Sequence, residues 1–136
     1  MGENINDNSN ISKQICPRPE HEVYTGKPIQ RSDGQWFDAY GKKMTKDEAY
    51  SSMFWSKYAD SDLCTRMQDS MTEILKSSFD KGMFNLFVSK SGIEQEDKER
   101  ISAFRILANK SGYNLGELKF NPKSYTVSGK IDQSKK

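Results

Sequence analysis

The sequence predicts an α+β fold, a small and mainly helical domain of three to four helices with an N-terminal β-hairpin and a short C-terminal strand pair. Three observations predict this class. Residues 45–48, Thr-Lys-Asp-Glu, match a capping box at the start of a helix. Residues 62–79 repeat apolar side chains at intervals of three and four, as an amphipathic helix does. Short alternating segments on both sides of this helical block are typical of strands.

The size and composition of the chain fit one domain with polar ends. It has 136 residues, of which 34% are apolar and 29% are charged, and its mean hydropathy is −0.88. A chain of about this length can bury a core without disulfides or metals. We therefore expect a disordered or extended segment over residues 1–22, a single globular domain over 23–128 and a flexible basic tail over 129–136.

Charge and hydropathy narrow the classes of function. The net charge of +2 is too small to predict binding to nucleic acid or to an anionic membrane by itself. No apolar run approaches the ~20 residues that span a bilayer, and the polar first residues do not resemble a signal peptide. We expect a cytoplasmic protein that does not bind membranes. Cys16 and Cys64 can form a disulfide, but a cytosol favours reduced thiols.

The first half of the chain contains three predicted elements. Residues 15–32 are expected to be irregular because three prolines oppose a helix there. A β-hairpin is predicted over residues 34–44, with a turn at 38–41 that has Asp first and Gly last. The first helix should cover 46–59. The second should cover 62–79, with Ser61 as its N-cap and Gly82 beyond its end.

The second half contains one ambiguous segment. Residues 83–88 form an apolar run that periodicity cannot assign to strand or to buried helix, and we expect helix. A further helix should begin after a capping box formed by Ser91 and Glu94, and should end near Lys110 before Gly112. Alternating residues within 117–120 and 125–128 predict the C-terminal strand pair.

No catalytic or metal site is predicted. Cys16 and His21 are spaced like two zinc ligands, but a closed site needs four and the chain has one histidine. Residues 78–81 match an S-x-x-K motif without the Ser-x-Asn element that accompanies it in penicillin-binding enzymes. Asp60-Ser61-Asp62 lacks the Gly and Glu that complete a calcium loop. We therefore expect a protein that is not an enzyme and has no cofactor.

The aromatic side chains of the first helix are the main sign of a binding surface. Phe54 and Trp55 lie about 100° apart around the helix, so one narrow core stripe cannot bury Trp55 together with its aromatic neighbours. We expect the hairpin, the N-terminal segment or another chain to cover part of this helix. The predicted partner-binding residues are Trp36, Tyr40, Tyr50, Phe54, Trp55 and Tyr58.

A second hypothesis is that the hairpin binds nucleic acid. Bases can stack on Trp36 or Tyr40 while neighbouring cations bind phosphates. Residues 110–136, with six bases and two acids, can add phosphate contacts. The predicted contacts are Lys27, Arg31, Lys42, Lys43, Lys46, Lys119 and Lys123.

The favoured function is therefore that of a small non-enzymatic interaction protein, such as an adaptor, an inhibitor or a regulatory accessory. It would bind a protein partner or its own copy through the helix 46–59 and the hairpin. The alternative is a nucleic-acid-associated regulatory protein. Salt separates the two, because binding through phosphates weakens steeply as the salt concentration rises.

Overall fold

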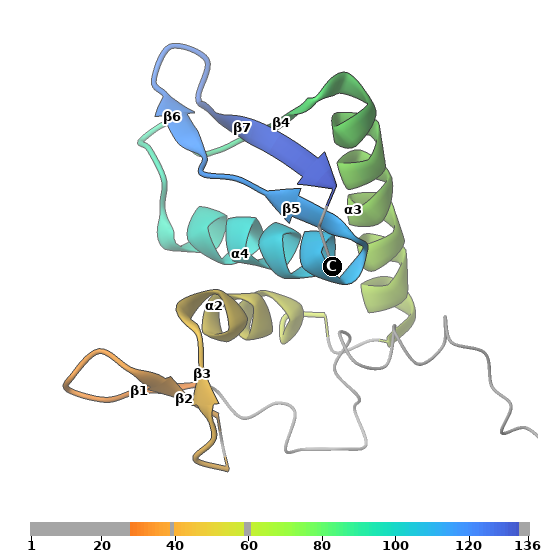
Figure 1. Cartoon of the computed structure of the whole chain (residues 1–136). Coiled ribbons are helices and arrows are strands. Elements are labelled where there is room, and N and C mark those ends of the chain that lie inside the picture. The colour runs from red at the N-terminus through yellow and green to blue at the C-terminus, as the bar shows by residue number, and fades with distance from the viewer. Residues whose placement is uncertain (1–27, 39, 59–60, 134–136) are drawn as a thin grey trace, which may run out of the picture.

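The computed structural model describes residues 28–38, 40–58 and 61–133 and confirms the predicted α+β class. Figure 1 shows the larger sheet at one end of the molecule, α4 beneath it, α2 beneath α4 and a small sheet at the opposite end. The elements are, in chain order, β1 (Ile29–Gln30), β2 (Trp36–Phe37), β3 (Lys43–Met44), α2 (Lys46–Trp55), α3 (Ser61–Lys81), β4 (Met83–Phe87), α4 (Gln95–Lys110), β5 (Tyr113–Leu115), β6 (Lys119–Asn121) and β7 (Thr126–Gln133).

The small sheet confirms the predicted hairpin and enlarges it. β2 and β3 pair antiparallel, and β1 adds a third strand from a segment that we expected to be irregular. The turn follows its sequence signal. The Asp38 carboxylate accepts from the backbone N–H groups of Tyr40 and Lys42, each at 2.8 Å, and Gly41 adopts a φ of 84°. This left-handed conformation favours glycine, which explains its place at the end of the turn.

Helix α2 begins at the predicted capping box. The Glu48 N–H donates to Thr45 Oγ1 at 3.0 Å, and the Thr45 N–H donates to Glu48 Oε1 at 2.8 Å. The helix ends at Trp55, earlier than the predicted end at residue 59. The Tyr58 N–H donates to the Trp55 carbonyl at 2.9 Å, so the chain tightens into an i→i+3 turn directly after the helix.

Helix α3 contains the predicted segment 62–79 and extends it to Ser61–Lys81. Ser61 is therefore the first residue of the helix and not its cap. The three-four repeat directs Cys64, Met71 and Leu75 into the core. Gly82 ends the helix with a φ of 79° and an N–H that donates to the Phe79 carbonyl at 3.0 Å.

The prediction of a helix over residues 83–88 is wrong, because Met83–Phe87 form strand β4. Phe84 is fully buried, whereas Met83 and Phe87 on the other face are exposed. This period of two is that of a half-buried strand. β4 and β5 each pair antiparallel with β7, so they are parallel to each other and α4 connects them in a split β-α-β unit.

The predicted C-terminal strand pair corresponds to β6 and the first half of β7. The prediction of a free tail from residue 129 is wrong up to residue 133, because these residues form the second half of β7. This half pairs with β5, a strand that we did not predict, and Ile131 opposite Leu115 is buried. The long β7 is thus the central strand of the larger sheet.

A β-bulge connects β5 and β6. Leu115 lies opposite Ile131 and Lys119 lies opposite Ser128, so the register shifts by one residue between these pairs. Glu117 and Leu118 consequently share Gly129 as their neighbour on β7. A Cβ atom at Gly129 would lie 2.4 Å from the Glu117 carbonyl oxygen, so only glycine fits there without a shift of the backbone.

Helix α4 ends at Lys110 as predicted, but it does not begin with a capping box. Glu94 is the N-cap and makes no side-chain cap bond. The Ser91 hydroxyl instead bonds the Glu94 carboxylate. Asp97 and Glu96 remain in the first turn, where the helix dipole favours acids.

The core lies between the larger sheet and helices α3 and α4, and extends to the end of α2. Its largest fully buried side chains are Leu75, Phe84, Phe104, Leu107 and Val127. Cys64 is also buried and is disulfide-bonded, so the expectation of reduced thiols is wrong for this residue. The sequence has one other cysteine, Cys16, which lies outside the described residues.

Two polar contacts hold α2 and the residues that follow it against α4. The Ser102 hydroxyl donates to Asp47 Oδ1 at 2.9 Å. Further along, Lys57 Nζ lies 2.8 Å from Oε1 of Glu99, which is mostly buried and also accepts from the Gln95 side chain. The hydrogen bond to Glu99 raises the pKa of Lys57. Partial burial of the ammonium group lowers this pKa, and the negative charge of Glu99 raises it further.

Replacing Lys57 with methionine should lower the free energy of unfolding by about 1–2 kcal/mol at neutral pH, because it leaves the buried Glu99 without its cation. This loss of stability is smaller than that expected for a fully buried ion pair, because about half of the Lys57 side chain is exposed to solvent. Because the pKa of Lys57 is raised in the folded state, its pairing with Glu99 stabilises the fold fully at pH values below the ordinary lysine pKa. This stabilisation is lost as pH rises through the raised value. Urea unfolding of wild type and variant at neutral pH and near pH ~11 should therefore show a smaller difference at high pH.

Candidate functional site

β4 forms a free edge of the larger sheet, since within the described residues only β7 pairs with it. In an antiparallel pair, alternate residues direct both backbone groups to the partner strand. The Val88 N–H donates to the Tyr125 carbonyl at 2.8 Å, which continues the β4–β7 register and fixes its phase. Phe84 and Leu86 therefore bond to β7. Met83, Asn85 and Phe87 direct their backbone groups to the free edge.

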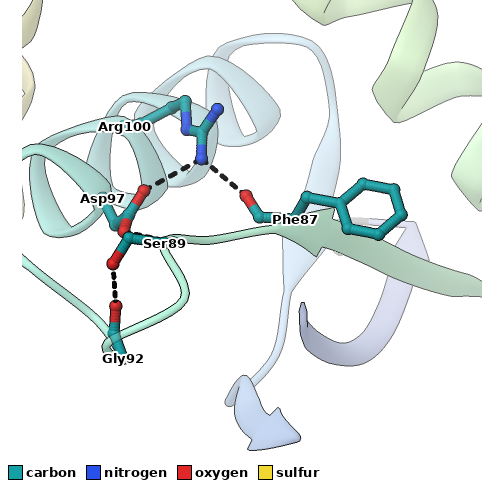
Figure 2. A network of polar contacts seen from close by, with 5 residues as sticks. All are labelled: Phe87, Ser89, Gly92, Asp97 and Arg100. Atoms are coloured by element: carbon teal, nitrogen blue, oxygen red, sulfur yellow. Dashed lines mark hydrogen bonds and ion pairs between the residues drawn. The ribbon is translucent and has the colours of Figure 1, made fainter. Parts of the chain in front are cut away.

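Side chains of α4 close one end of this edge (Figure 2). Arg100 Nη2 donates to the Phe87 carbonyl oxygen at 2.6 Å and lies 3.0 Å from Asp97 Oδ1. Asp97 Oδ2 accepts from the Ser89 N–H at 2.9 Å, and the Ser89 hydroxyl donates to the Gly92 carbonyl. These bonds occupy edge groups of Phe87 and Ser89. Another strand cannot pair with groups that are already bonded.

The other end of the edge is open. Among the described residues, no side chain bonds the outward backbone groups of Met83 or Asn85, in contrast to Phe87. Each of the two residues therefore presents one N–H and one carbonyl. Unpaired strand groups of this kind are a template for the backbone of another chain.

An open groove of about 720 Å³ lies along this open half of the edge. It is lined by one acid, one base, three serines, one asparagine and two apolar residues, so its charges balance and its surface is mixed. The lining residues are Ser70, Glu73, Ile74, Ser77, Ser78 and Lys81 from α3, with Met83 and Asn85 from β4. A strand edge beside a helix is the arrangement in which extended peptides bind by strand addition.

Two exposed apolar side chains of β4 lie beside the unpaired backbone groups of Met83 and Asn85. Met83 is 50% exposed and Phe87 is 74% exposed. Both lie on the face of the sheet that points away from the helices, because they pair with Lys130 and Thr126 while the intervening Phe84 faces the core. Burial of these two side chains against a partner would favour binding.

The structure does not assemble the predicted partner-binding residues into one exposed surface. Trp55 is only 3% exposed, Phe54 is also buried, and Tyr58 packs against the same core cluster. The physical reason is that α2 packs along α4, which brings the Trp55 ring into the core cluster. Tyr58 folds back onto the last turn of α2, with its ring 5.3 Å from that of Phe54 and 6.1 Å from that of Trp55. Of the covers that we expected for this helix, another chain is therefore not needed for Trp55, which is buried within the chain itself.

The remaining predicted residues lie near the small sheet. Trp36 packs edge-on against Tyr50 with ring centroids 5.7 Å apart, and both line an open hollow of about 420 Å³ with Lys43 and Lys46. Lys46 Nζ lies 5.5 Å from the centre of the Tyr50 ring. Tyr40 is at the tip of the hairpin and is exposed.

The residues predicted for nucleic-acid binding are divided between the two ends of the molecule. Lys42, Lys43 and Lys46 lie at or next to the small sheet, where Arg31 stacks on Phe37 at 3.7 Å. Lys119 is on β6, and Lys123 follows that strand. Figure 1 shows α2 and α4 between these two regions, so they do not form one patch. Lys27 lies outside the described residues.

The sequence does not predict the β4 edge, because the only local signal of this strand is short. The alternation of Phe84 and Leu86 with Met83, Asn85 and Phe87 is present in the sequence, but five residues do not separate strand from helix. The position of β4 at an edge depends on its pairing with β7, about 40 residues away along the chain. No local pattern carries that information.

Over the described residues, no group of three or more His, Cys, Asp or Glu side chains is placed to hold a metal ion. Within the same part of the chain, no helix has the length and apolarity needed to cross a membrane. Comparison with protein-family models, curated proteins and solved structures found no match.

Proposed function

We propose that this chain is a non-enzymatic protein-interaction module, an adaptor, inhibitor or regulatory accessory, that binds an extended backbone along the open half of β4. The observation that supports the proposal most strongly is the contrast along one edge. Arg100 occupies the edge carbonyl of Phe87 and Asp97 occupies the edge N–H of Ser89, whereas the edge groups of Met83 and Asn85 open onto a groove. Proteins normally block exposed strand edges, so an edge that is blocked at only one end suggests use of the other end.

The test removes one edge N–H and leaves the β4–β7 pairing in place. Asn85→Pro deletes an N–H that points away from β7, and proline is tolerated at such edge positions. Peptides selected from a random display library on the purified chain should bind Asn85→Pro roughly 30- to 100-fold more weakly, because a backbone hydrogen bond is lost and the proline ring obstructs pairing.

Asn85→Ala is the matched variant, because it changes the same side chain and keeps both backbone groups. It should bind the selected peptides within about threefold of wild type. Circular dichroism of both variants checks that β4 is intact. Equal binding by wild type and Asn85→Pro would contradict the proposal.

The nucleic-acid alternative has one supporting observation, the hollow in which Trp36 and Tyr50 lie beside Lys43 and Lys46. An aromatic surface with adjacent cations can hold a base and its phosphate. Affinity for a single-stranded oligonucleotide would then fall steeply with salt, whereas strand addition at β4 would change little.

A further inference from the structure

We propose that the partner at the β4 edge is a second copy of this chain, paired antiparallel through its own β4 with Met83 opposite the partner's Asn85. This inference rests on the proposed function, since it names the occupant of the same edge. Three features of that edge support a second copy. Its backbone groups, its exposed side chains and its charges each match the same features of another copy.

The backbone groups match in this register. A two-fold axis next to Phe84 places Met83 opposite the partner's Asn85 and Asn85 opposite the partner's Met83. Each of these pairs can exchange two hydrogen bonds, which uses every open N–H and carbonyl of the two residues. Met83 opposite the partner's Phe87 would instead require the Phe87 carbonyl, which Arg100 already binds.

The exposed apolar side chains match in the same register. Residues diagonal to each other across an antiparallel pair are within reach of long and aromatic side chains. Met83 is then diagonal to the partner's Phe87, and Phe87 is diagonal to the partner's Met83. The interface would therefore contain two equivalent contacts, each between an exposed methionine and an exposed phenylalanine of the other copy. Each contact would bury both side chains and place the sulfur favourably against the ring.

The charges of the groove also favour a second copy over a strongly charged partner. Glu73 and Lys81 give the groove one charge of each sign. A copy that carries the same two residues meets the groove without an excess of like charge, whereas an acidic or a basic peptide would meet one repulsive group for each attractive one.

Light scattering after size exclusion, over a range of protein concentrations, tests the occupant. Wild type and Asn85→Ala should approach twice the monomer mass as the concentration rises, and Asn85→Pro should keep the monomer mass. A small interface of this kind is expected to dissociate on dilution. A monomer mass for wild type at all concentrations, or a dimer that persists in Asn85→Pro, would overturn the inference.

A charge pair tests the register. Met83→Glu and Phe87→Lys lie too far apart within one strand to meet, but they become diagonal neighbours across the proposed interface. Each single substitution should weaken the dimer roughly tenfold, and the double substitution should recover at least half of that loss on a logarithmic scale. Purely additive losses would contradict this register.

The two proposals fail separately. If wild type is a monomer but selected peptides still bind in a manner that Asn85→Pro abolishes, the second copy is excluded and the strand-addition site remains. If peptide binding is also insensitive to Asn85→Pro, the site itself is excluded.

Discussion

Replacing Phe104 with alanine should lower the free energy of unfolding by about 3–5 kcal/mol. Phe104 projects from the middle of α4 with 1% of its surface exposed, and its ring centroid lies 5.1 Å from that of Phe84 in an edge-on contact. The variant would lose the transfer free energy of the ring and leave a cavity between α4 and the larger sheet. Urea unfolding followed by circular dichroism measures the change.

Two controls separate this cavity from a general effect of removing an aromatic ring. Phe104→Leu keeps most of the volume and should cost less than Phe104→Ala. Tyr40→Ala removes an exposed ring at the hairpin tip and should change stability by less than about 0.5 kcal/mol. A loss below about 1 kcal/mol for Phe104→Ala would show that the core does not centre on this residue.

Gly129→Ala should destabilise the fold by about 2–4 kcal/mol, although it adds a single methyl group to a strand. The added Cβ would lie 2.4 Å from the Glu117 carbonyl oxygen and 2.9 Å from Leu118 Cδ2. The carbonyl belongs to the backbone of the bulge and cannot rotate away, so β7 or the β5–β6 connection must shift. The loss is measured by the same urea titration.

Gly116 supplies the matched control from the same bulge. A Cβ atom there would lie 3.4 Å from the Lys130 carbonyl oxygen, which is ordinary contact, so Gly116→Ala should cost less than about 1 kcal/mol. If the two alanine variants were equally stable, the register shift between β5 and β6 would be absent.

Features fixed by neighbouring residues could be predicted from the sequence. The capping box at Thr45 and Glu48, the Asp38–Gly41 turn and the end of α3 at Gly82 each depend on side chains within a few residues, and each is present in the structure. The long apolar repeat of α3 predicts a helix because it spans several turns. Local interactions of this kind are strong enough to show in a single sequence.

Features fixed by distant pairing could not be predicted. Residues 129–133 look like a polar tail until β5 provides their partner, and β4 becomes an edge strand only through β7. The burial of Trp55 depends on the packing of α2 along α4, which the aromatic count of the helix does not reveal. The candidate site therefore appears only at the level of sheet topology.

Amide hydrogen exchange resolved by residue tests the central claim most directly. In the dilute, unbound chain the amides of Met83 and Asn85 should exchange rapidly, while those of Phe84 and Leu86, bonded to β7, should be protected. In the associated or peptide-bound chain, we expect the Asn85 amide to gain at least about tenfold protection. An Asn85 amide that is already protected in the free chain, or that stays fast in the complex, would contradict strand addition at this edge.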